Sequence, residues 1–104
     1  MADFVKVADL AEVPPGEMTL VDFQGEPVAL ANVGGTIYAF SDSCTHMAGD
    51  LSQGLLEDTI VTCPLHGGQF DVTSGDVVAA PPTETLPMYQ VQVSDGGEIQ
   101  LSTT

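Results

Sequence analysis

The sequence predicts an all-β fold of antiparallel sheets, a small sandwich or barrel, and three observations indicate it. Apolar and polar residues alternate in many places, which is the pattern of half-buried strands. Eleven glycines and seven prolines divide the chain into short segments, as in small all-β domains. No segment of about ten residues or more has the apolar spacing of an amphipathic helix.

The first part of the chain contains four expected strands. Residues 4–8 (FVKVA) and 17–23 (EMTLVDF) form two of them, and the breaker Pro14-Pro15-Gly16 separates them. Residues 10–13 (LAEV) form a short helical turn at most. Residues 27–40 (PVALANVGGTIYAF) form a hairpin whose turn is Gly34-Gly35, because paired glycines favour the tight turns of hairpins.

The last part of the chain contains a second expected hairpin. In residues 87–93 (PMYQVQV), Tyr89, Val91 and Val93 share one face of a strand. A turn follows at residues 95–97 (DGG), and the apolar side chains of residues 99 and 101 again share a face.

The middle of the chain, about residues 42–82, differs in composition and is expected to form two long loops mounted on the β scaffold. Its one clear strand is residues 58–63 (DTIVTC). Long loops in a compact domain are frequently functional. We expect the carboxylates of Asp42, Asp50 and Asp71 to be solvated; alternatively, Asp71 and Thr73 stabilise the turn before Gly75. We expect Phe70 to lie in the core.

The charge is strongly one-sided, with 15 acidic residues against one basic residue, Lys6, for a net charge of −14. Such a field repels nucleic acid and anionic membrane surfaces, and it attracts a partner with a basic docking patch. The chain begins without a basic leader and an apolar run. We therefore expect one soluble, cytoplasmic domain, residues 1–104, that is a monomer.

Both cysteines and both histidines of the chain occur in two short motifs. Cys44 and His46 form C-x-H, and Cys63 and His66 form C-x-x-H after a gap of sixteen residues. Thiolate and imidazole suit zinc or iron–sulfur chemistry. Structural zinc sites usually draw ligands in like pairs, whereas a two-iron cluster explains the mixed pairs. Each motif can send its Cys to one iron and its His to the other, as in Rieske [2Fe–2S] centres.

From about residue 36 to the end, the chain resembles the Rieske-type ferredoxins, in particular the ferredoxin components of multicomponent aromatic-ring dioxygenases. The resemblance rests on CTH, CPLHGGQFDVTSG and LPMYQVQV, and the earlier strands are compatible with it. It implies a Rieske-like fold in which a two-loop, cluster-binding subdomain lies at the tip of a β base. It also implies that Cys44 and Cys63 bind the buried iron, and that His46 and His66 bind the outer iron.

The same resemblance implies a function. A Rieske [2Fe–2S] domain without a substrate pocket is a one-electron carrier and not an enzyme by itself. Its partners would be a flavin-containing NAD(P)H reductase and a terminal oxygenase, which would dock transiently and in turn.

Three alternatives remain open at this point. The two cysteines could be inert core residues or a disulfide, or the four side chains could form a structural zinc module. Alternatively, the domain could be an electron-transfer small subunit in a nitrite reductase or diiron monooxygenase system. A permanent subunit should expose a sizeable apolar patch.

Overall fold

The computed structural model describes residues 4–42, 51–64, 68–79 and 87–102 of the 104-residue chain. Every strand pair in these residues is antiparallel. Strands and short 3₁₀ helices have the following bounds: β1 Phe4–Asp9, η1 Leu10–Glu12, β2 Met18–Phe23, β3 Glu26–Val33, β4 Thr36–Ser41, η2 Leu51–Gln53, β5 Leu55–Glu57, β6 Ile60–Thr62, β7 Gln69–Asp71, β8 Val77–Ala79, β9 Met88–Tyr89, β10 Val91–Val93 and β11 Glu98–Ser102.

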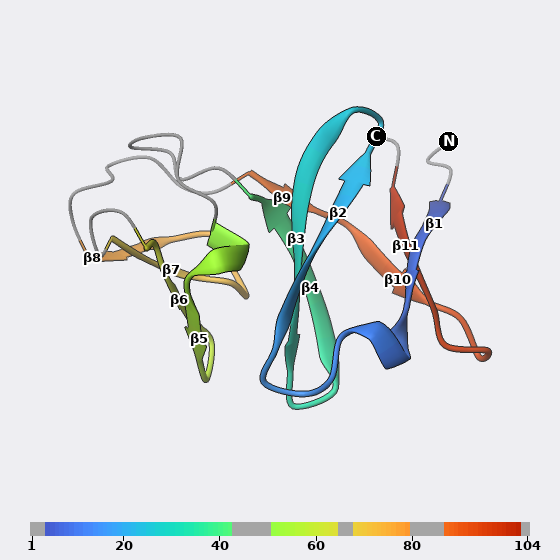
Figure 1. The fold of residues 1–104 in the computed structure, drawn as a ribbon, viewed down its shortest axis with the longest axis horizontal. Coiled ribbons are helices and arrows are strands. Elements are labelled where there is room, and N and C mark those ends of the chain that lie inside the picture. The colour runs from blue at the N-terminus through green and yellow to red at the C-terminus, as the bar shows by residue number, and fades with distance from the viewer. Residues whose placement is uncertain (1–3, 43–50, 65–67, 80–86, 103–104) are drawn as a thin grey trace.

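The strands form three sheets, which Figure 1 shows side by side. The central sheet has the order β2-β3-β4-β9, and the outer sheet has the order β1-β11-β10. Together these two sheets are called the base. The third sheet has the order β5-β6-β7-β8. With η2 it is called the lobe, and it lies on the opposite side of the central sheet from the outer sheet (Figure 1).

Within the central sheet, β3 is buried on both faces because its residues alternate between two apolar cores. Ala29 and Ala31 of β3 face the lobe, where they pack with Phe70. Val28 and Leu30, the intervening residues of β3, pack toward the outer sheet. The period-two alternation therefore serves two cores, and the small alanines leave room for the lobe to approach β3.

Most predicted base elements are confirmed. The predicted strands at residues 4–8 and 17–23 are β1 and β2, the helical turn is η1, and the hairpin of residues 27–40 is β3 and β4. Gly34 and Gly35 form its two-residue turn, both with positive φ (61° and 98°). Gly97 also has positive φ (83°) and donates its N–H to the Ser94 carbonyl oxygen at 2.9 Å, so the predicted 95–97 turn is present.

Two expectations about strands are wrong. Residues 87–93 do not form one strand, because β9 pairs with β4 of the central sheet while β10 pairs with β11 of the outer sheet. The chain changes sheets at Gln90, whose carbonyl oxygen accepts the Ser102 N–H at 3.1 Å. The described residues of the middle segment also form four strands rather than one. Each has only three residues, too few for an alternating pattern to be visible in the sequence.

Across the described ranges, no helix is long and apolar enough to cross a membrane.

Candidate metal centre

Of the four predicted ligands, the structure describes Cys63. Cys44, His46 and His66 lie outside the described residues, as does Asp50. Within residues 4–42, 51–64, 68–79 and 87–102, no three His, Cys, Asp or Glu side chains gather closely enough to hold a metal ion. Cys63 and its surroundings are therefore the part of the predicted centre that can be described.

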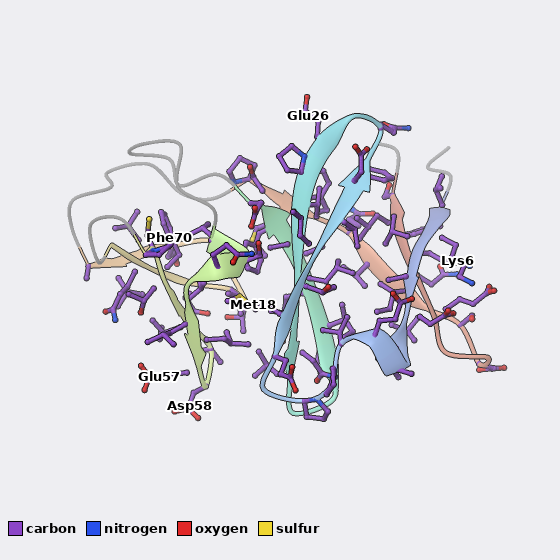
Figure 2. All side chains as sticks on the ribbon, in the orientation of Figure 1. Lys6, Met18, Glu26, Glu57, Asp58 and Phe70 are labelled. Atoms are coloured by element: carbon purple, nitrogen blue, oxygen red, sulfur yellow. The ribbon has the colours of Figure 1, made fainter. Side chains whose placement is uncertain are left out.

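Cys63 directly follows β6 and is a free, buried cysteine, with 2% of its surface exposed. It belongs to the apolar core between the lobe and the central sheet, together with Phe70. Figure 2 labels Phe70 within the lobe. The Cys63 N–H donates to the Gly68 carbonyl oxygen at 2.7 Å. This bond joins the point where the chain leaves β6 to the point where it enters β7, so the two ends of the second motif are held together.

The two ends of the first motif are held together in the same way, by Asp42. The Leu51 N–H donates to the Asp42 carbonyl oxygen, and the Ser52 N–H donates to Asp42 Oδ1, both at 2.7 Å. The Asp42 N–H in turn donates to the Pro27 carbonyl oxygen at 3.1 Å, which ties this point to β3. Both predicted ligand motifs are thus attached to the fold by short hydrogen bonds at their ends.

The expectation that Asp42 is solvated is wrong, because the residue is 1% exposed. A carboxylate can be buried when backbone N–H groups donate to it, since these bonds replace the lost hydration.

Asp71 behaves as predicted. Its Oδ1 accepts the Thr73 N–H at 2.9 Å and the Thr73 hydroxyl at 2.6 Å, and so stabilises the turn before Gly75. Phe70 is fully buried, which confirms its place in the core.

Gly54 is a positioning residue that the sequence did not reveal. A Cβ at this position would overlap the carbonyl oxygen of Thr62, the residue before Cys63. The Gly54 N–H also donates to the Leu51 carbonyl oxygen at 2.9 Å. Gly54 therefore allows η2 and the end of β6 to approach each other, which fixes the backbone that presents Cys63.

These surroundings fit a cluster of the predicted kind. Cys63 offers a soft sulfur donor in an apolar setting, at the end of a strand whose backbone is fixed from both sides. The chain's one Lys or Arg, Lys6, is on β1, at the far side of the base from the lobe (Figure 2).

Comparison with known families favours the two-iron cluster over inert cysteines and over a zinc module. Residues 3–90 match the Rieske [2Fe-2S] domain. The chain belongs to that family. It is also 39% identical over 90 residues to the "Naphthalene 1,2-dioxygenase system, ferredoxin component" of Pseudomonas aeruginosa, with 86% of each chain covered.

Solved structures agree with this assignment. A chain in the "Complex of reduced oxygenase and oxidized ferredoxin in carbazole 1,9a-dioxygenase" is similar with a TM-score of 0.89 and 35% identity, over 95% of this chain and 92% of that one. A putative NADH-dependent nitrite reductase small subunit from Mycobacterium tuberculosis gives a TM-score of 0.87 at 21% identity, covering 100% of this chain and 97% of the other. The latter likeness shows the fold alone.

The Rieske chain is thus an electron carrier with a Rieske-type [2Fe–2S] cluster. Its relatives are ferredoxin components, which carry electrons within multicomponent systems and are not the catalytic enzymes. The predicted fold class, cofactor and electron-carrier function are confirmed.

Proposed function

We propose that Cys44 and Cys63 ligate one iron of the cluster and that His46 and His66 ligate the other. Buried Cys63 supports this assignment, since a thiolate on the inner iron needs a protected position at the end of a fixed strand. The hydrogen bonds at the ends of both motifs support it as well, because they fix where each Cys–His segment leaves and re-enters the fold. When bound, such a cluster accepts and releases a single electron.

We propose further that the chain is a single domain, residues 1–104, and a monomer that takes electrons from a flavin-containing NAD(P)H reductase. It then delivers them to a terminal oxygenase. The names of the similar proteins support the oxygenase. The net charge of −14 supports transient encounters with basic surfaces, which electrostatic attraction accelerates.

Among the described residues, the distribution of exposed apolar side chains favours a free carrier over a permanent subunit. The large apolar residues that are more than about two-fifths exposed come from five different strands. They are Val5, Leu20, Leu55, Val78 and Val93. A permanent subunit interface would instead concentrate apolar surface in one patch.

The observation that carries the proposal is the buried Cys63 at the closed end of the β6–β7 hairpin, in a chain of the Rieske family. The test is reconstitution with a purified reductase and oxygenase of an aromatic-ring dioxygenase system. We expect oxidation of the aromatic substrate to depend on the concentration of this chain. If the reductase reduces it but no oxygenase accepts its electron, the proposed delivery is wrong.

A further inference from the structure

We propose that a cleft between the β2–β3 turn and β9 binds an arginine side chain of the electron-transfer partner. The cleft has a volume of about 500 Å³. Its lining combines apolar and aromatic side chains with the acidic residue Glu26. The lining residues that matter here are Phe23, Glu26, Pro87, Met88 and Tyr89. This inference rests on the proposed function, because it specifies how a partner is held.

The aromatic side of the cleft is rigid. Phe23 and Tyr89 pack edge to face, with ring centroids 5.8 Å apart and an interplanar angle of 86°. Phe23 is 5% exposed, whereas Tyr89 is only partly buried. Tyr89 is held by pairing of β9 with β4, opposite Ala39. An incoming side chain therefore meets an aromatic surface whose position is already fixed.

The backbone of Glu26 is also fixed, because this residue directly follows a tight two-residue turn. Gln24 and Gly25 both have positive φ (55° and 83°), and Phe23 pairs with Glu26 across the turn. The Gly25 N–H donates to Asp22 Oδ1 at 2.9 Å. Turns of this kind match the twist of the flanking strands. Figure 2 shows Glu26 projecting from this end of the hairpin.

No lysine or arginine of the same chain can neutralise Glu26. Lys6 is the chain's one Lys or Arg. Its Nζ lies 3.2 Å from Asp9 Oδ1 and 3.6 Å from Glu98 Oε2, on the far side of the base. Burial, and secondarily the charge of Glu26, raise the pKa of Tyr89. A guanidinium for this cleft must come from another molecule.

Arginine fits this combination better than other side chains. Its planar guanidinium stacks on aromatic rings and pairs with a carboxylate through two parallel hydrogen bonds. Its aliphatic stem can lie against apolar residues such as Pro87 and Met88 while the charge stays near water.

The cleft also lies next to the attachment of the lobe. The Pro87 carbonyl oxygen accepts the Ser41 N–H at 3.0 Å. The residue after Ser41 is Asp42, which holds the two ends of the first ligand motif together. A partner anchored in the cleft would therefore lie beside the part of the protein that holds the cluster.

The test compares Glu26→Gln with Glu17→Gln in cluster-loaded protein. Glu17 is exposed and lies beside the opposite end of β2, so both variants lose one charge but only one alters the cleft. We expect Glu26→Gln to raise the KM for this chain about five-fold with the reductase or the oxygenase, and Glu17→Gln to raise it less than about two-fold. Equal effects of the two variants on both partners would overturn the proposal.

A titration with N-acetylarginine amide tests the cleft without any partner. Amide NMR signals of Glu26, Met88 and Tyr89 should shift, and those shifts should be lost in Glu26→Gln and with the uncharged citrulline analogue. Shifts that are the same for both compounds, or none, would contradict arginine binding. If the wild-type chain passes no electrons at all, the proposed function fails, and this titration alone then decides the cleft.

Discussion

The base and the lobe keep their shape by different means. β1 to β4 have six to eight residues each, so many side chains that alternate between two faces define their register. The strands of the lobe have three residues each. Their register depends on tight turns, on packing of Val61 and Phe70 against the central sheet, and on single contacts at Asp42, Gly54 and Cys63.

This difference matches their tasks. A base with two apolar cores provides stability that no one contact determines. The lobe has fewer apolar residues to bury, and a cluster bound there would contribute stability that the short strands lack. Changes in the lobe should therefore affect iron binding before they affect the base, and the predictions below separate the two regions.

The largest effect is expected from Cys63→Ser, which replaces the Cys63 thiol with a hydroxyl of similar size. We expect loss of bound iron and of visible absorption, because serine is a poor ligand for this type of cluster. Hydrogen exchange should quicken in β6 and β7 while β3 and β4 stay protected. A variant that keeps wild-type iron content would show that Cys63 is only a core residue.

The next effect is expected from Gly54→Ala. The new methyl group would overlap the Thr62 carbonyl oxygen, so either η2 or the end of β6 must move. We expect a loss of about 1–3 kcal/mol in the free energy of unfolding and a lower iron content.

Gly96→Ala is the matched control in the base. A Cβ there meets nothing closer than Ser94 Oγ at 4.0 Å, so the change in stability should stay within about 0.5 kcal/mol. Equal thermal midpoints for the two alanine variants would contradict the role given to Gly54.

A smaller difference is expected between Asp42→Ala and Asp22→Ala. Each removes a carboxylate that accepts a backbone N–H, that of Ser52 at 2.7 Å or that of Gly25 at 2.9 Å respectively. Asp42 is buried and Asp22 is exposed. The first variant should lose about 1–3 kcal/mol of stability and the second about 0.5–1.5 kcal/mol, because only the first leaves a donor shielded from water. Urea unfolding of both variants measures the difference.

The smallest effect concerns pH and Tyr89 in the base. Burial raises the pKa of its phenol above the ordinary value of 10.0, and Glu26 adds to this. A raised folded-state pKa gives stability that is present below the ordinary value and is lost as the pH rises through the raised value. Tyr89→Phe should therefore flatten the alkaline decline of the thermal midpoint. An unchanged decline would show that other groups cause it.

The sequence predicted the base better than the lobe for a physical reason. Alternation over longer segments identified β1 to β4, and Gly34-Gly35 identified the turn between β3 and β4. The three-residue strands of the lobe carry too little pattern, and the change of sheet at Gln90 depends on tertiary pairing with Ser102.

Single residues at the site were predicted unevenly as well. The spacing of Cys and His indicated the cluster because those residue types have few other uses together. Asp42 looked like an ordinary loop acid. Its carboxylate accepts the N–H of Ser52, a residue too far along the chain for a local capping pattern to be visible. Gly54 gave no signal in the sequence, since the carbonyl oxygen that it accommodates belongs to Thr62 of β6, eight residues further along the chain.

Metal and sulfide analysis of the purified chain, followed by EPR after reduction, tests the central claim most directly. The account predicts about two iron and two sulfide ions per chain and an EPR signal that appears on reduction. A colourless protein that contains zinc, or no metal, would contradict it.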